Sequence, residues 1–332
     1  MEKNRLNLLR KILLRFGILL GIGLLLIQIL NVYESLANQT LILRHIWPFI
    51  VAIAIVIINI FIQIEAWIIM MQALNVDMPH HEARRGYVLS FFARYIPGSV
   101  WGYISRSEWL WQKYQVTYKQ SNYVSILEIL LDLFSSLLAI GICMVLLIID
   151  KIYIIPIILV IILLIIIWIA LPSQLLPFAT RLFPSVYQEN FPRLKLQSHK
   201  WVLPIILRLM NWFIYGFTLF LIGLAFETWQ TDQFISHWIQ LTKDYCLAWL
   251  SGYVIIFLPS GLGVRELVLS SQLTNHFHLD PGVAMGISVI MRFVIMIAEF
   301  ACVPLLYLLK QIFVRNNIQS QDSSNNKQIG LP

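Results

Sequence analysis

The sequence predicts an all-α integral membrane protein, and three observations support this fold class. Of the 332 residues, 59% are hydrophobic and only 12% are charged, whereas soluble domains average about 45–50% apolar and about 25% charged residues. Several apolar runs reach the roughly 20 residues that a helix needs to cross about 30 Å of hydrocarbon. Two further apolar segments are interrupted by proline and glycine, which predicts broken helices there.

The uninterrupted apolar runs predict six full membrane spans. Their approximate limits are residues 12–33, 47–74, 122–149, 152–171, 201–226 and 281–309. The first run is longer than the hydrophobic region of a signal peptide, which has about 7–15 residues. We therefore interpret it as a span, and cleavage after Ser35-Leu36-Ala37 remains the alternative.

The two broken segments share a pattern of proline and glycine followed by arginine. The first reads Arg94-x-x-Pro97-Gly98-x-x-x-Gly102-x-x-x-Arg106, and the second reads Leu258-Pro259-x-Gly261-x-Gly263-x-Arg265-Glu266. We expect the helix breaks at Pro97, Gly98, Gly102, Pro259, Gly261 and Gly263. In the first segment the half-helices should cover residues 84–96 and 99–111, and each would be about 20 Å long at about 1.5 Å per residue, too short to cross. The second segment should cover residues 245–276, after an acidic link over 227–244.

Basic residues favour a topology in which both broken segments are re-entrant hairpins. In that topology the basic residues of both termini and of the links near 84, 113 and 172–200 are cytoplasmic. A full crossing by residues 84–110 would place Lys113, Lys119 and the basic link before residue 200 on the other side. The order span, span, hairpin, span then occurs twice with opposite orientation, which predicts an inverted repeat.

This topology divides the chain into three parts. A basic cytoplasmic N-terminus covers residues 1–11, and a transmembrane domain covers 12–310, with one half over about 12–150 and the other over about 151–310. The tail over 311–332 is rich in Gln, Asn and Ser, so we expect it to be disordered and cytoplasmic. We expect the protein to reside in a bacterial-type cytoplasmic membrane.

Eleven ionisable side chains lie within the apolar or broken segments, where each costs roughly 2.5–3.5 kcal/mol on insertion scales unless it faces protein or water. We expect four arginines to bind a lipid headgroup: Arg94, Arg106, Arg265 and Arg292. The others should form a charge network that positions them: Glu65, Glu108, Glu128, Asp132, Arg208, Glu266 and Glu299. The alternative is that these residues only form salt bridges between the two halves.

An anionic ligand fits the hairpins better than a cation does. The second half-helix of each hairpin begins just after the proline and glycine residues. Its first amide groups and the positive end of its dipole would then face the membrane interior. The anion most readily found at that depth is the phosphate of a lipid headgroup.

Other classes of function find little support in the sequence. We find no phosphate loop, nucleophile elbow or dinucleotide fingerprint. His80 and His81 lack the second histidine that a zinc-binding helix needs, and the histidines near 276 lie in a predicted short external loop, where a solvated turn is the better interpretation. The net charge of +7 comes from residues that flank apolar runs, which indicates membrane orientation rather than nucleic-acid binding. We therefore expect no catalytic residues, no metal, no cofactor and no enzymatic activity. Aromatic residues near the span ends, such as Trp47 and Tyr87, are interpreted as interface anchors.

The two motifs, with Glu128 about 20 residues after the first, resemble the flippase-like transmembrane family named for lysylphosphatidylglycerol synthase. The resemblance extends from about residue 12 to residue 310. It implies a polytopic domain that, in the aminoacyl-phospholipid synthases, moves the modified lipid between leaflets. Relatives also occur alone or fused to glycosyltransferases. The residues after 310 leave no room for an aminoacyl-transfer domain, so lysyl transfer is not expected here.

Three functional hypotheses follow. The first is a translocase, either a flippase or a scramblase, for an anionic phospholipid or a lipid-linked saccharide. The second is a non-catalytic membrane subunit that binds a polyprenyl-phosphate sugar for a separate glycosyltransferase. The third is a structural scaffold. Membrane lipids are the expected partners under the first hypothesis, and a glycosyltransferase is added under the second.

Overall fold

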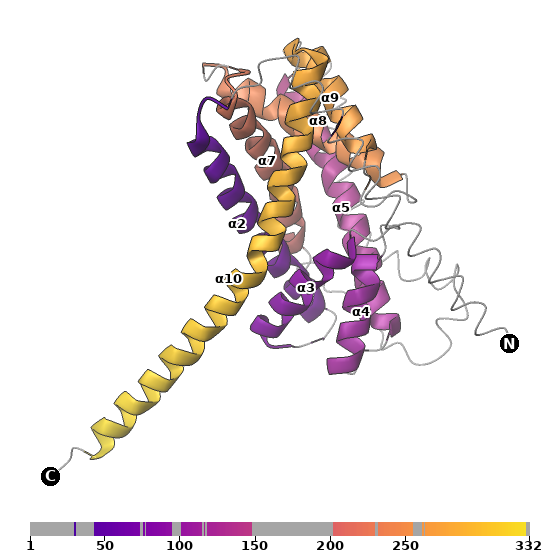
Figure 1. Ribbon diagram of the computed structural model, residues 1–332. Coiled ribbons are helices and arrows are strands. Elements are labelled where there is room, and N and C mark those ends of the chain that lie inside the picture. The colour runs from indigo at the N-terminus through magenta and orange to yellow at the C-terminus, as the bar shows by residue number, and fades with distance from the viewer. Residues whose placement is uncertain are drawn as a thin grey trace.

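The computed structural model describes residue 30 and residues 43–73, 76, 78–94, 101–114, 116, 118–147, 202–229, 232–254, 261 and 263–329. These residues form eight helices and no strands (Figure 1). The helices are α2 (Ile46–Ala73), α3 (His80–Arg94), α4 (Trp101–Tyr114), α5 (Tyr118–Leu147), α7 (Val202–Ala225), α8 (Phe234–Val254), α9 (Val264–Phe277) and α10 (Pro281–Ile329). The all-α fold class is confirmed.

Four of these helices contain segments that are long and apolar enough to cross a membrane. The segments are Ile46–Ala73, Val124–Leu147, Val202–Ala225 and Pro281–Tyr307. They correspond to the second, third, fifth and sixth predicted spans. The predicted spans 12–33 and 152–171, the N-terminus over 1–11 and the link over 172–200 lie outside the described residues.

The first broken segment forms a pair of packed antiparallel helices, α3 and α4. Glu82 near the start of α3 forms an ion pair with Lys113 near the end of α4. One turn further into the pair, Gly86 lies against the ring of Trp109, and a Cβ atom on Gly86 would be 2.6 Å from Trp109 Cε3. Contact this close requires a glycine, because any side chain would push the two helices apart.

The second broken segment forms a similar pair, α8 and α9. Nδ1 of His276 near the end of α9 is 3.0 Å from Asp244 Oδ2 on α8. At the other end of the pair, Gly252 lies against the side chain of Arg265. Figure 1 shows α3 and α4 in the lower part of the bundle and α8 and α9 in the upper part. Insertion of the two pairs from opposite membrane faces, as re-entrant hairpins, stays a prediction.

Several predicted boundaries of the broken segments need correction. The half-helices end at Arg94 and begin at Trp101, so Gly102 is a helical residue rather than part of the break. Pro97, Gly98 and Pro259 lie outside the described residues. Only Gly261 and Gly263 are described at a break, and both have positive φ angles, of 69° and 89°.

Helix α8 begins earlier than predicted, because residues assigned to the acidic link are helical from Phe234 onward. Phe234 and Trp238 lie four residues apart on one face of α8 and pack against Phe217 of α7. The ring centroid of Phe217 is 5.9 Å from that of Phe234 and 6.1 Å from that of Trp238. This apolar contact supports a helix where the acidic residues suggested a loop. Asp244, which we expected in the link, is buried with 0% exposure.

The C-terminal region also differs from the prediction. We expected disorder over 311–332, but α10 continues as a helix through Ile329. Residues 311–329 contain neither proline nor glycine. A helix that is already nucleated adds residues at little cost until such a residue ends it.

Helix contacts follow the pattern that an inverted repeat requires. Let α2, α3, α4 and α5 of the first half exchange with α7, α8, α9 and α10 of the second half. Under this exchange each contacting helix pair has a counterpart in the other half. The contact of α5 with α8 corresponds to that of α10 with α3, and the contact of α2 with α10 corresponds to that of α7 with α5. The contact of α4 with α5 likewise corresponds to that of α9 with α10. Among the described helices, the contacts thus support the predicted inverted repeat.

Helices α2 and α7 lie at the centre of this pattern and run antiparallel. The backbone N–H groups of Arg44 and His45, just before α2, donate to the carbonyl oxygen of Ala225 at the end of α7. Near mid-span, Asn211 Oδ1 accepts hydrogen bonds from Asn59 Nδ2 (2.8 Å) and Gln63 Nε2 (2.7 Å). Such buried polar bonds between transmembrane helices are worth about 0.6 kcal/mol on average, and here they fix the register of the central pair.

The α3–α4 ion pair predicts a dependence of stability on pH. The hydrogen bond from Lys113, together with its charge, holds the pKa of Glu82 below the usual 4.5. The pair therefore contributes stability above the unfolded-state pKa, and this contribution is lost as the pH falls through the lower folded-state pKa. Because Lys113 is 41% exposed, we expect Lys113→Met to cost less than about 1 kcal/mol at neutral pH. Unfolding of both proteins across pH should show this difference disappearing in acid, and a difference that is constant with pH would contradict the assignment.

Candidate functional site

A pocket with a volume of about 160 Å³ lies between the two halves of the bundle. Seven helices line it, since α2, α4, α5, α7, α8, α9 and α10 each contribute at least one side chain. Of the described residues of the first half, three line the pocket: Gln63, Tyr103 and Asp132. Both broken segments contribute residues to the pocket, and most of its described wall comes from the second half.

The pocket lies near the middle of the apolar spans. Asn211 in its wall is nine residues after the start of the span Val202–Ala225, and Arg292 is eleven residues after the start of Pro281–Tyr307. At about 1.5 Å per residue these positions are roughly 14–17 Å from the span ends, which is about half of a hydrocarbon thickness of about 30 Å. A polar group in the pocket would thus be near the membrane midplane.

One wall of the pocket is built on a buried cluster of charges. Glu128 of α5 accepts hydrogen bonds from Arg106 Nη2 of α4 and Arg208 Nη2 of α7, both at 2.7 Å. Arg208 also donates to Asp132 at 2.9 Å, and the hydroxyl group of Tyr87 donates to Glu128 at 3.1 Å. Exposure of Arg106, Glu128 and Arg208 is 2%, 1% and 2%. The two arginines and two carboxylates balance one another in charge.

Aromatic rings surround the Arg106 end of this cluster. The guanidinium carbon is 4.4 Å from the ring centroid of Tyr87, 5.1 Å from that of Tyr103 and 5.4 Å from that of Trp67. Ring faces attract a cation most when it is removed from water. Tyr87 is itself 0% exposed, so it is a core residue and our interpretation of it as an interface anchor was wrong.

A second ion pair borders the pocket from the other half. Glu266 of α9 accepts a hydrogen bond from Arg292 Nη1 of α10 at 2.8 Å, and its other oxygen accepts the N–H of Gly263 at 2.7 Å. In the first half, the equivalent helices α4 and α5 are joined by Arg106 and Glu128. Each half therefore ties its second half-helix to the following span with one Arg–Glu pair, and the two residue types are exchanged between the halves.

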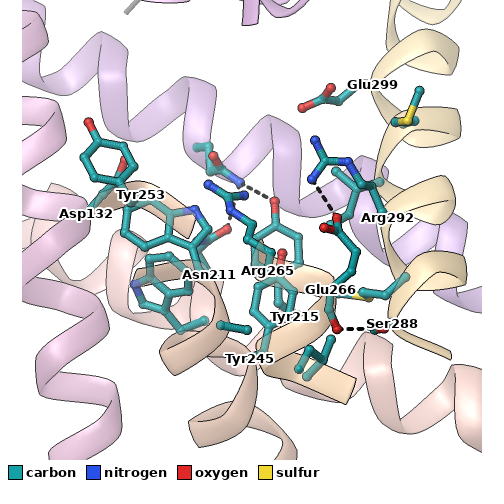
Figure 2. A pocket seen from close by; sticks show the side chains of 18 of the residues that line it. Asp132, Asn211, Tyr215, Tyr245, Tyr253, Arg265, Glu266, Ser288, Arg292 and Glu299 are labelled. Atoms are coloured by element: carbon teal, nitrogen blue, oxygen red, sulfur yellow. Dashed lines mark hydrogen bonds and ion pairs between the residues drawn. The ribbon is translucent and has the colours of Figure 1, made fainter. Parts of the chain in front are cut away.

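Arg265 differs from the other described arginines of the pocket. Arg208 and Arg292 are held by carboxylates, but no hydrogen bond or ion pair holds Arg265 in the part of the chain that the structure describes. Its Nε atom is buried without a hydrogen-bond partner, and its guanidinium carbon lies 5.5 Å from the ring centroid of Trp249. Arg265 therefore supplies the pocket with a positive charge that no described carboxylate neutralises. Figure 2 shows it among the labelled residues of the pocket.

The backbone around the second break brings Arg265 into this place. Gly261 has a φ angle of 69°, which side chains rarely adopt, and a Cβ atom there would be 2.7 Å from the carbonyl oxygen of Gly252. Gly263 precedes α9 with a φ angle of 89°. The glycines allow the chain to turn tightly against α8 and begin α9 at once, which places Arg265 in the first turn beside the pocket.

The structure separates residues that the sequence analysis grouped together. Arg265 and Arg292 line the pocket, as do Asp132, Arg208, Glu266 and Glu299. Arg106 does not line it, because the ion pair with Glu128 holds it outside. The side chain of Arg94 lies outside the described residues.

Two of the predicted network residues lie elsewhere. Glu65 pairs with Arg84 at the interface of α2 and α3, where Arg84 Nε donates to it at 2.9 Å. Glu108 accepts a hydrogen bond from Gln112 one turn later on α4, at 2.6 Å. Neither residue lines the pocket.

Sequence reasoning did not identify the aromatic side of the pocket. The rings of Tyr103, Trp212, Tyr215, Tyr245, Trp249 and Tyr253 all line it. Four of these residues recur on α7 and α8 at spacings of three or four, as Trp212 and Tyr215 and as Tyr245 and Trp249. That spacing predicts one helical face, but an aromatic face within a span is equally expected for ordinary core packing.

Comparison with protein families identifies the family of the chain. The family model described as "Lysylphosphatidylglycerol synthase TM region" matches residues 12–301. No curated protein and no solved structure matches the chain. The matched range includes both broken segments and each described residue that lines the pocket.

Proposed function

Because this chain belongs to the family of lysylphosphatidylglycerol synthase TM regions, we propose that it moves an anionic lipid between membrane leaflets. In this proposal the headgroup of the lipid passes through the pocket between the two halves. Its phosphate binds Arg265 while the acyl or prenyl chains remain in the surrounding lipid. The protein transports the lipid without altering it chemically.

The observation that carries the proposal is the unpaired charge of Arg265 at mid-span. A cation at this depth is costly unless it has a partner, and the described carboxylates beside it are already engaged. Glu266 binds Arg292, and Asp132 binds Arg208. A lipid phosphate would complete the charge balance of the pocket with a charge-assisted hydrogen bond.

The remaining features of the bundle suit such a passage. An inverted repeat lets the two halves rock about a central site, and the helix pairs α3–α4 and α8–α9 are the elements that would open toward the two faces. No ATPase motif occurs in the sequence. The movement would thus follow a lipid gradient, be driven by an ion gradient, or equilibrate the leaflets.

Reconstitution into liposomes with headgroup-labelled lipids tests the proposal. A membrane-impermeant quencher removes outer-leaflet label only, so movement by the protein should increase the quenched fraction above that of protein-free vesicles. We expect this increase for anionic lipids and a smaller one for zwitterionic lipids. Arg44→Ala, which changes a 59%-exposed arginine outside the pocket, should behave as the wild type. Tight lipid binding without any movement would instead favour the membrane subunit that presents a carrier lipid to a glycosyltransferase.

A further inference from the structure

The hydrogen-bonding groups left open in the pocket indicate which headgroup it accepts. A headgroup is recognised by the polar groups that the protein itself leaves unsatisfied, because those groups lose water on binding and must regain a partner. The described lining contains such groups, and they are not all charged.

Two neutral donors in the wall lack a hydrogen-bond partner in the part of the chain that the structure describes. No hydrogen bond to the hydroxyl group of Tyr245 or to the indole N–H of Trp249 occurs among these residues, although Tyr245 is only 8% exposed. The other polar rings differ, since Trp212 Nε1 donates to Ser135 at 2.8 Å and the hydroxyl group of Tyr215 accepts from Gln63 at 3.3 Å. Tyr245 and Trp249 are thus available to a ligand.

These donors lie on a continuous aromatic surface next to Arg265. The ring centroid of Trp249 is 4.9 Å from that of Tyr253 and 4.8 Å from that of Trp212. The centroid of Tyr245 is 5.0 Å from that of Tyr215. The guanidinium group of Arg265 lies over Trp249, so the charged group and the two neutral donors belong to one site (Figure 2).

An amino headgroup does not fit this arrangement. An ammonium group needs a carboxylate or an aromatic face that no other cation approaches, but the charge of Arg265 over Trp249 would repel a second cation at this aromatic surface. Glu128, Asp132 and Glu266 are engaged by arginines, and Glu299 also has an interaction within the protein. A phosphate alone would leave much of the pocket unfilled, because the volume of about 160 Å³ is about ten times the roughly 10–15 Å³ that one water molecule requires.

We infer that the pocket binds a lipid phosphate that carries an uncharged, hydroxyl-rich group, that is, a sugar or a cyclic polyol. The phosphate binds Arg265, the hydroxyl groups bind Tyr245 and Trp249, and the apolar face of the sugar ring packs on the aromatic surface. This inference rests on the proposed function and specifies its substrate class. Two lipids share this chemistry, a phosphatidylinositol and a polyprenyl-phosphate hexose.

Lipid binding by the full chain in nanodiscs of zwitterionic lipid tests the inference through the intrinsic tryptophan fluorescence. The probes are phosphatidylinositol, a polyprenyl-phosphate hexose, phosphatidic acid and phosphatidylserine. We expect at least one of the first two to bind about tenfold or more tightly than phosphatidic acid or phosphatidylserine, and the comparison between them identifies the source of the headgroup. Tyr245→Phe, which removes only a hydroxyl group, should lower the affinity for the preferred lipid about 3- to 10-fold, the effect expected for the loss of one neutral hydrogen bond. The same variant should leave the affinity for phosphatidic acid unchanged.

Matched variants separate the possible failures. Tyr114→Phe changes a tyrosine outside the pocket and should leave each affinity unchanged, and Trp249→Phe repeats the test of Tyr245→Phe at the second donor. Equal affinities for phosphatidylinositol, the hexose lipid and phosphatidic acid, with no effect of either pocket variant, would overturn the inference. If the inference fails in this way but Arg265→Ala no longer binds any of the anionic lipids, the proposed function would still stand. Binding that is independent of Arg265 would contradict both.

Discussion

Arg265→Ala should strongly weaken the binding of anionic lipid and, at the same time, make the lipid-free protein more stable. Hydrogen bonds to charged groups are worth about 1.5–3 kcal/mol, so the affinity should fall by about 10- to 150-fold. The gain in stability follows because the substitution removes a cation that no hydrogen bond or ion pair holds in the described structure, and a desolvated charge without an ionic partner is destabilising. Lipid titration and thermal unfolding of the same purified protein measure both effects.

Two comparisons make this result specific. Arg265→Lys keeps the charge but not the planar guanidinium group, so it should retain part of the affinity. Arg292→Ala should have the opposite effect on stability, because it leaves Glu266, which is 3% exposed, without its ion pair. A loss of stability in Arg265→Ala as large as that in Arg292→Ala would show that Arg265 has a structural partner, and the proposal would lose its main support.

Glu128→Gln should destabilise the protein more than any of these arginine substitutions. The carboxylate neutralises Arg106 and Arg208, which are both 2% exposed. Loss of one member of a buried ion cluster costs about 3–5 kcal/mol, because here Arg106 would stay buried without a carboxylate and Arg208 would keep only Asp132. Since α4, α5 and α7 all meet at this residue, we expect loss of folded protein on purification or a much lower unfolding temperature in detergent.

An exposed carboxylate provides the control for this effect. Glu227 is 52% exposed and pairs with Arg44 at 3.8 Å, so Glu227→Gln should change the free energy of unfolding by less than about 1 kcal/mol. If Glu128→Gln were as stable as Glu227→Gln, the cluster would not hold the two halves together. Its arginines would then be candidates for ligand binding, the role that the sequence alone suggested for Arg106.

The sequence predicts the fold well because its strongest signals are local. Long apolar runs specify helices in lipid, and four of the six predicted spans correspond, with nearly the predicted limits, to helices that are long and apolar enough to cross a membrane. The breaks were predicted for the same reason, since proline and glycine act on their own backbone, and of the predicted break residues only Gly261 and Gly263 are described at a break. The boundary of α8 was missed because its first turns are supported by ring contacts with α7, such as that of Trp238 with Phe217, and these are contacts between distant residues.

The candidate site is predicted only in outline. Ionisable residues in apolar sequence stand out, and six of those predicted do line the pocket. Their pairing does not follow from the sequence: Arg208 joins Glu128 across 80 residues, and Arg292 joins Glu266 across 26. For this reason Arg106 and Arg265, in similar motifs, received the same role, although a described carboxylate neutralises only Arg106. The aromatic wall carries no signal that separates it from core packing.

One measurement tests the central claim most directly, namely the movement of a headgroup-labelled anionic lipid in vesicles that contain equal amounts of wild-type or Arg265→Ala protein. The account predicts that the wild type increases the rate of label loss to an impermeant quencher, and that the variant, although folded, lowers this increase tenfold or more. Equal rates for the two proteins would contradict it, because the lipid would then cross without using the unpaired charge of the pocket.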